Sequence, residues 1–234
     1  MIYQHRSMTC RRGKLHSRTE LFAKTRLDNF ESFGSPLIGA FETITGQDAF
    51  SIAWQYRQFK SFKDWASQQR EIAENKQKNA TRKPSNLSPY IDEVDTFLIQ
   101  LNERCSPIQK DWESFSEIDQ DIKGIFIQNI YEFQLSELDE AIAGYFDIIY
   151  PSYDHPGADL IGLFGTIVGP GSVNGKSLRQ VELIRFEDLM AWTDWRKKQK
   201  EDTEFNKISR VRWFSKIERL NSVIMEPTDF SRIR

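Results

Sequence analysis

The chain has 234 residues, of which 39% are hydrophobic and 28% charged, a profile typical of a globular rather than a disordered protein. At this length it can bury a substantial core, as one domain or as two small ones. Lys and Arg (32) nearly balance Asp and Glu (34), which argues against a broad basic surface for nucleic acid or a charged membrane. We expect a cytoplasmic protein with no membrane segment, because no long apolar run or signal peptide is visible.

The first half of the chain predicts three helices among several strands. Alternating residue types predict strands, and apolar residues at near-helical spacing predict helices. The expected strands are 1–10, 37–45 and 50–59, and the expected helices are 14–33 and 61–79. A turn is predicted at 46–48, between the second and third strands. A polar insertion with two prolines follows at about 79–90, then a helix at 91–102, and a short closing strand and linker within 103–124.

The second half repeats the first. Residues 37–46 (LIGAFETITG) and 160–169 (LIGLFGTIVG) share seven of ten residues at an offset of 123. Beyond residue 170 the best match has an offset of 130, which places Tyr56 against Phe186. The difference of seven residues predicts a loop insertion at 170–176 in the second half. The second half then predicts an amphipathic helix at 138–149, a long charged helix from about 188 to 217 and a final strand. We therefore expect one repeat at 1–108, a linker at 109–124 and a second repeat at 125–234.

Each repeat reads as a ferredoxin-like βαββαβ unit, which forms a four-stranded sheet with helices on one face. The uncovered face must pack against something, and a second such sheet is the usual solution. The predicted fold is therefore α+β, with two repeats closing an intramolecular pseudo-dimeric α+β barrel. An eight-stranded barrel has room for packed side chains or one small ligand, so we expect a small molecule as partner.

Several segments resemble the NIPSNAP family. MIYQHRSMTCRRGKL is similar to its first strand and turn, LIGAFETITGQD and AWQYRQF to its second and third strands, and IMEPTDFS to its closing strand. Gln4 departs from the family's usual Glu. The resemblance implies a fold shared with dimeric α+β barrel proteins, a group that includes cofactor-free oxygenases, cyclases, isomerases and haem-handling enzymes. Such a protein works as a monomer with an internal pseudo-dimer or as a homodimer.

The first strand carries the strongest candidates for chemistry. Its alternation places Gln4 and Arg6 on one face and His5 on the other, and either face can line the barrel. Arg6 is the candidate anchor for a carboxylate, enolate or phenolate, or else forms a structural salt bridge with Glu42 or another acid. Gln4 is a candidate for substrate binding. His5 is a candidate base near neutral pH, or a core histidine with satisfied hydrogen bonds.

Aromatic residues form the rest of the predicted pocket. Trp54 and Tyr56 share one face of the third strand and could form a wall for a planar substrate, with Phe41 shaping the pocket. Tyr131 could exchange a proton or hydrogen bond with the ligand. Core packing is the alternative reading of these residues.

His155 lies in a loop beside Asp154, where it could be a base, a substrate contact, a metal or haem ligand, or simply part of a polar loop. No pair of histidines or cysteines has metal-site spacing, so we predict no metal. The function expected is a metal-independent enzyme of isomerase, cyclase or oxygenase type, acting on a small hydrophobic or aromatic metabolite in a biosynthetic pathway. The alternatives are a non-catalytic binding or protein-interaction module and a haem-binding enzyme; otherwise no cofactor is expected.

Overall fold

The computed structural model of the chain describes residues 1–32, 35–45, 52–78, 88–108, 124–154, 157–173 and 176–233. Eight strands in these ranges close into one antiparallel barrel, in the order β1-β3-β2-β10-β5-β9-β6-β4, which confirms the predicted α+β barrel. The strands are β1 (Ile2–Cys10), β2 (Leu37–Thr45), β3 (Ile52–Phe59), β4 (Ile91–Leu101), β5 (Ile125–Phe133), β6 (Ala158–Val168), β9 (Arg179–Phe186) and β10 (Ile217–Pro227).

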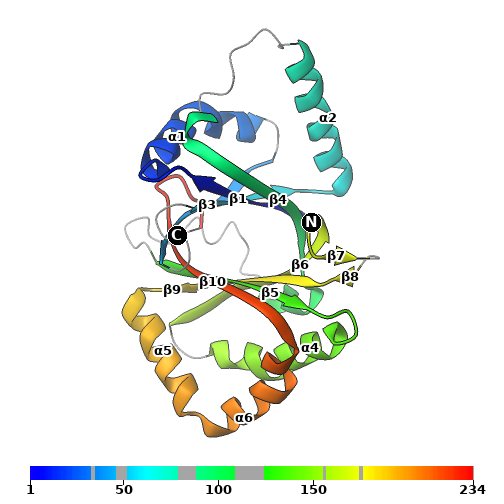
Figure 1. The fold of residues 1–234 in the computed structure, drawn as a ribbon, viewed down its shortest axis with the longest axis vertical. Coiled ribbons are helices and arrows are strands. Elements are labelled where there is room, and N and C mark those ends of the chain that lie inside the picture. The colour runs from blue at the N-terminus through cyan, green and yellow to red at the C-terminus, as the bar shows by residue number, and fades with distance from the viewer. Residues whose placement is uncertain are drawn as a thin grey trace.

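The barrel consists of two four-stranded sheets. The first has the order β4-β1-β3-β2 and the second β10-β5-β9-β6, so each sheet uses strands from one half of the chain. The pairs β2–β10 and β4–β6 join the two sheets into a closed barrel. Figure 1 shows the sheets facing each other across the middle of the molecule.

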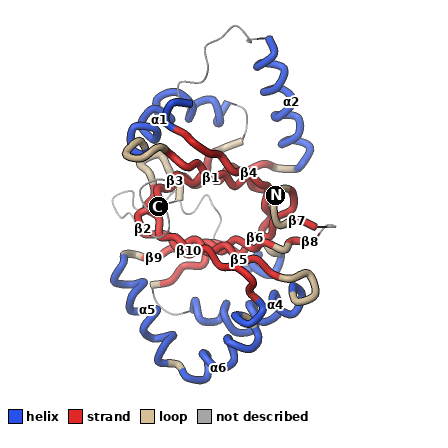
Figure 2. Tube along the Cα trace, viewed as in Figure 1, coloured by secondary structure: helices blue, strands red, loops and turns tan. Residues whose placement is uncertain are grey.

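Helices cover the outer face of each sheet, as Figures 1 and 2 show. Helices α1 (Leu15–Ser32) and α2 (Phe62–Lys78) lie over the first sheet. The second sheet is covered by α4 (Leu138–Gly144), α5 (Leu189–Glu201) and α6 (Thr203–Arg212). The side chains of Asp188 and Asp202 cap α5 and α6 by accepting hydrogen bonds from the backbone N–H groups of Ala191 and Phe205. No helix in the described part of the chain is long and apolar enough to cross a membrane.

Two predicted elements are wrong. The long helix expected from about 188 to 217 is two helices, α5 and α6, which are separated at Asp202. Residues 91–102 were expected to form a helix, but Ile91–Leu101 is strand β4, which closes the first sheet beside β1. In the strand, Val94, Thr96 and Leu98 lie on one face, and Glu93, Asp95 and Phe97 lie on the other, which lines a cavity. The expected closing strand within 103–124 is therefore β4 itself, and Glu103–Ile108 forms a short 3-10 helix.

Strand pairing also corrects the offset between the repeats. His5 pairs with Tyr56 in the first sheet, and Gln128 pairs with Leu183 in the second. His5 and Gln128 keep the offset of 123, so Tyr56 is equivalent to Leu183, at an offset of 127 rather than 130. Of the predicted loop insertion, Ser172–Val173 and Lys176–Ser177 pair as a two-stranded ribbon (β7 and β8). The predicted turn at 46–48 and most of the linker and of the polar insertion lie outside the described residues.

One end of the barrel interior is filled with side chains. Tyr3, Phe126 and Phe164 belong to one buried cluster there. After β10 the chain runs back along β2, where the N–H of Ile233 donates to the carbonyl oxygen of Ile38 at 3.1 Å. Ile233 is fully buried in the same cluster. Room for a ligand therefore has to be sought at the other end, where the C-terminal halves of β1 and β5 lie.

Candidate functional site

A cavity of about 480 Å³ lies at this other end of the barrel. Strands of both halves line it because the C-terminal ends of β1 and β5 reach the same mouth. The lining residues are Ser7, Thr9, Ile52, Trp54, Glu93, Asp95, Phe97, Ile130, Glu132, Arg179, Arg219, Leu220 and Asn221.

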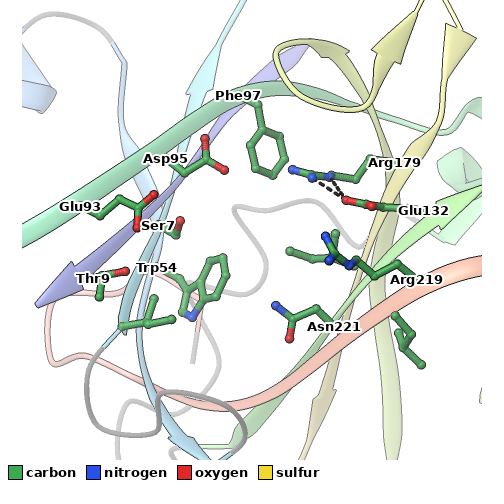
Figure 3. A pocket seen from close by; sticks show the side chains of 13 residues that line it. Ser7, Thr9, Trp54, Glu93, Asp95, Phe97, Glu132, Arg179, Arg219 and Asn221 are labelled. Atoms are coloured by element: carbon green, nitrogen blue, oxygen red, sulfur yellow. Dashed lines mark hydrogen bonds and ion pairs between the residues drawn. The ribbon is translucent and has the colours of Figure 1, made fainter.

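The two sides of the cavity differ in charge (Figure 3). Glu93 and Asp95 of β4 lie on one side, directly across from Thr9 and Ser7 of β1. On the other side, the Arg179 guanidinium donates two hydrogen bonds to Glu132 Oε1, at 2.5 and 3.1 Å. Arg219 and Asn221 of β10 lie on this side as well, and Arg219 is the cross-strand neighbour of Glu132.

Trp54 and Phe97 supply the aromatic part of the lining, and Trp54 is fixed in place by a hydrogen bond. Its indole Nε1 donates to the hydroxyl of Thr43 on β2 at 2.7 Å. The Arg179 guanidinium lies 5.4 Å from the centre of the Phe97 ring, which adds a cation–π contact. The tryptophan is therefore held by β2 and the phenylalanine by a charged neighbour, so both rings can act as a rigid surface.

His5 packs against both of these rings. Its ring centre is 4.4 Å from that of Phe97 and 5.2 Å from that of Trp54. Its Nε2 is 2.9 Å from Oε1 of Gln128, the equivalent residue of the second half. The Tyr56 hydroxyl donates to the same oxygen. These three polar residues thus meet in the middle of the barrel, two from the first sheet and one from the second.

This network determines which nitrogen of His5 carries the proton. An amide oxygen only accepts hydrogen bonds, so Nε2 must be the donor and Nδ1 keeps a lone pair. Within the described residues, neither His5 Nδ1 nor Gln128 Nε2 has a hydrogen-bond partner, although both are buried. Burial, with a smaller contribution from Arg179, lowers the pKa of His5 from 6.5 to about 4. His5 is therefore a neutral imidazole with a buried acceptor nitrogen at neutral pH.

Arg6 and Gln4 lie outside the barrel, on the helix-covered face of the first sheet. Because side chains alternate along β1, both point away from the interior that His5 occupies. Arg6 Nε donates to Thr96 Oγ1 at 3.3 Å, and burial lowers the pKa of Arg6. Gln4 accepts a hydrogen bond of 3.3 Å from Arg57. The structure therefore does not bring Arg6 and Gln4 together with His5, and neither lines the cavity.

Tyr131 likewise lies on the outer face, in the second sheet. Its hydroxyl donates to Glu182 Oε2 at 2.7 Å. The hydroxyls of Tyr145 and Tyr153 donate to Glu182 Oε1 at 2.7 and 2.6 Å, and the Asn129 amide donates to Oε2 at 2.7 Å. Glu182 is fully buried. Tyr131 thus belongs to a closed network that satisfies a buried carboxylate, and burial together with that carboxylate raises its pKa well above 10.

The other predicted residues divide between these places. Tyr56 and Phe41 lie inside the barrel, where their rings contact edge to face at 6.0 Å, and Phe41 also packs on Phe126. Of the predicted site, the structure thus brings together His5, Trp54, Tyr56 and Phe41. His155 lies outside the described residues.

Sequence reasoning missed most of the charged lining. Glu93, Asp95 and Phe97 were hidden by the helix expected at 91–102, although their alternation with Val94 and Thr96 was a readable strand signal. Gln128 could have been found directly, because it is the equivalent of His5 at the repeat offset of 123. Arg179 and Arg219 carried no sequence signal of their own, since only the barrel closure places them at the mouth.

No group of three metal-ligating side chains occurs in the described ranges. The haem alternative stays a prediction, since His155, its candidate ligand, lies outside these ranges. The Nε2 of His5 donates to Gln128, so only its Nδ1 lone pair is left for a ligand. His16 is an exposed residue of α1 paired with Glu20.

No protein-family model and no curated protein sequence matches the chain. Solved structures do. An anthrone oxidase-like protein is 10% identical with a TM-score of 0.63, the match covering 97% of this chain and 91% of that one. A proposed monooxygenase from Fusobacterium nucleatum is 8% identical with a TM-score of 0.61, over the same shares. At these identities the likeness shows the fold alone: an α+β barrel of the kind found in monooxygenase-like proteins.

NIPSNAP-family proteins also occur among the structural neighbours, but they match about half of this chain. One from Agrobacterium tumefaciens is 23% identical over 47% of this chain and 91% of its own, with a TM-score of 0.41. Membership of that family stays a prediction.

Proposed function

We propose that this protein binds a small molecule with an apolar or aromatic body at the barrel mouth and transforms it without a metal. The reaction would be of isomerase, cyclase or oxygenase type. One observation carries the proposal: His5, whose ring packs against the cavity-lining rings of Trp54 and Phe97, holds a buried acceptor nitrogen without a partner among the described residues. Buried polar atoms are normally satisfied, and an exception calls for an explanation such as a bound water, a ligand or a catalytic role.

His5 would act as the proton acceptor. At neutral pH its Nδ1 is unprotonated and can take a hydrogen bond, or a proton, from a hydroxyl or an acidic C–H of the ligand. Burial disfavours the imidazolium, so the proton transfer becomes favourable only when an enolate or phenolate forms beside it as counter-charge. Gln128 holds the ring orientation, and burial raises the pKa of Tyr56, which stays a hydrogen-bond donor to Gln128.

The two full-length neighbours support the oxygenase variant, because one is described as anthrone oxidase-like and the other as a proposed monooxygenase. Both have the barrel architecture of this chain. Removal of a proton from an electron-rich ring gives a carbanion that can react with molecular oxygen, and that first step is what His5 would supply. A cytoplasmic location, and action as a monomer or a homodimer, complete the proposal.

Anthrone in air-saturated buffer is a suitable probe. Its oxidation consumes one O₂ per anthrone and yields one anthraquinone and one water, so oxygen uptake and anthraquinone can be counted separately. We expect saturable turnover that falls by at least about 100-fold in His5→Gln, the usual scale of a lost general base. Glutamine is the residue at the equivalent position of the other half, so this variant should still fold. His16→Gln, on the exposed face of α1, is the matched control and should match the wild type.

An unchanged rate in His5→Gln would refute the role of His5. Absence of saturable anthrone binding, measured by equilibrium dialysis, would refute the proposed site for apolar bodies.

A second candidate, a non-catalytic binding module, is favoured by the packing of the interior. His5 does not itself line the cavity, and the barrel below it is filled by Tyr3, Phe126 and Phe164. Saturable binding of anthrone with no oxygen uptake above the uncatalysed rate would assign this function instead.

A further inference from the structure

The cavity lies where the two halves of the barrel face each other, so equivalent positions of the repeats form its opposite walls. Phe97 of β4 pairs with His5, and Val223 of β10 pairs with Gln128, the equivalent of His5. Val223 is therefore the equivalent of Phe97. This offset of 126 makes Arg219 the equivalent of Glu93, and Asn221 the equivalent of Asp95. The strand positions are the same, but the side chains have opposite or no charge.

On the β4 wall, two carboxylates and two hydroxyls are gathered. Glu93 and Asp95 project from alternate positions of β4, and each lies across from a hydroxyl residue of β1, Thr9 and Ser7. Neither carboxylate has an ion pair or hydrogen bond within the described part of the chain. Two like charges on one strand face repel each other, so a cation between them would lower the free energy of the site.

The opposite wall does not supply that cation. The Arg179 guanidinium is held by Glu132 at 2.5 Å, and its side chain is largely buried in that pairing. Arg219 lies next to the same Glu132 across the β5–β10 pair. In Figure 3 both arginines lie across the cavity from Glu93 and Asp95, with Trp54 between the two sides. The cavity is therefore polarised, with a double negative charge on one wall and one excess positive charge on the other.

We propose that the ligand of this cavity carries a protonated amine beside an aromatic or apolar body. The ammonium group lies against Glu93 and Asp95, where each carboxylate accepts a charge-assisted hydrogen bond and the hydroxyls of Ser7 and Thr9 complete its shell. The body lies on Trp54, whose ring face also attracts a cation. This inference rests on the proposed function for the location of the site and adds the charge of its substrate class.

Three probes that share one ring test the charge: tryptamine, a cation; indole, neutral; and indole-3-propionate, an anion. Calorimetry at low salt should show tryptamine binding at least 10-fold more tightly than indole and indole-3-propionate weakest. In the double variant Glu93→Gln, Asp95→Asn, the affinity for tryptamine should fall at least 10-fold, while the affinity for indole stays within about 2-fold. Raising the salt to 0.5 M should weaken tryptamine binding to the wild type, because exposed charges are screened.

Glu218→Gln is the matched control, since it removes one carboxylate from an exposed position of β10 that does not line the cavity. It should bind tryptamine as the wild type does. Equal binding of tryptamine and indole-3-propionate, or unchanged tryptamine affinity in the double variant, would overturn the inference. Saturable anthrone binding with no tryptamine binding would overturn it too and leave the proposed function standing, whereas loss of anthrone binding as well removes the site itself.

Discussion

Replacing Glu182 by leucine should destabilise the protein strongly, while the same replacement at the equivalent position of the other half should not. Glu182 accepts hydrogen bonds from three tyrosine hydroxyls and from the Asn129 amide, and all of these lie between the second sheet and its helices. Leucine removes every acceptor at once and leaves the donors buried. An unsatisfied buried polar group costs about 1–3 kcal/mol, and some hydroxyls can turn toward each other, so we expect a loss of about 4 kcal/mol.

Gln55 provides the comparison, because strand pairing makes it the equivalent of Glu182. Gln55 is equally buried, but neither atom of its amide has a hydrogen-bond partner among the described residues. Leucine there removes an unsatisfied amide of similar volume. The stability of Gln55→Leu should therefore lie within about 1 kcal/mol of the wild type, or above it.

Urea unfolding followed by circular dichroism gives both free energies, and calorimetry gives the melting temperatures. For a chain of this length, 4 kcal/mol corresponds to a fall of about 8 °C. Glu182→Gln is an informative third variant, because it keeps one acceptor oxygen and should lose less than the leucine variant. Equal stabilities of the Glu182→Leu and Gln55→Leu proteins would refute the reasoning, since burial alone, without partners, would then decide both.

Three further predictions concern protonation and packing. The pKa of His5 is lowered to about 4, so below pH 6.5 the unfolded chain binds a proton that the folded chain does not. The free energy of unfolding therefore keeps its full value above pH 6.5 and falls by about 3 kcal/mol between pH 6.5 and pH 4. Urea unfolding of His5→Gln should lack this fall in stability between pH 6.5 and pH 4. If the free energy of unfolding changed with pH in the same way in both proteins, the lowered pKa of His5 would be refuted. Burial raises the pKa of four of the seven tyrosines, so above pH 10 only the unfolded chain ionises them and stability falls. Absorbance at 295 nm should show these four ionising only together with unfolding, and ionisation of all seven tyrosines in the folded protein would disprove it. A Cβ on Gly144 would lie 2.4 Å from the backbone oxygen of Arg212. Gly144→Ala should therefore destabilise the protein by about 1–3 kcal/mol, although alanine has the better helix propensity. A rise in melting temperature would refute this close contact.

The fold could be predicted from the sequence largely because the chain contains its own comparison. The shared LIGxFxTIxG run located the second strand of each sheet, and two such units have one common way to cover their free faces. The register was harder. A match of aromatic residues placed Tyr56 against Phe186, whereas strand pairing places it against Leu183, because a loop insertion can be divided among several positions without changing the apparent similarity.

The site was only half predictable. Residue alternation separated His5 from Arg6 and Gln4, but it does not say which face of a sheet turns inward, and that depends on which face the helices cover. Arg6 is long, charged and on a strand, so it resembled an anchor, yet it lies under the helices of the first sheet. Glu93 and Asp95 were missed for a different reason: residues 91–102 were assigned to a helix, and a helix does not place these carboxylates across from Thr9 and Ser7.

The divergence of equivalent positions shows where the two halves have taken different roles. On the outer faces, Gln55 and Glu182 are both buried, and only the second half has built a network around its polar group. Inside the barrel, His5 and Gln128 have instead become partners, one with an acceptor nitrogen left over and the other with a donor left over. At the mouth, Glu93 faces its equivalent Arg219 across the cavity. Two identical halves would give a cavity with equal charge on both walls, so an oriented ligand with two different ends is what this loss of symmetry would favour.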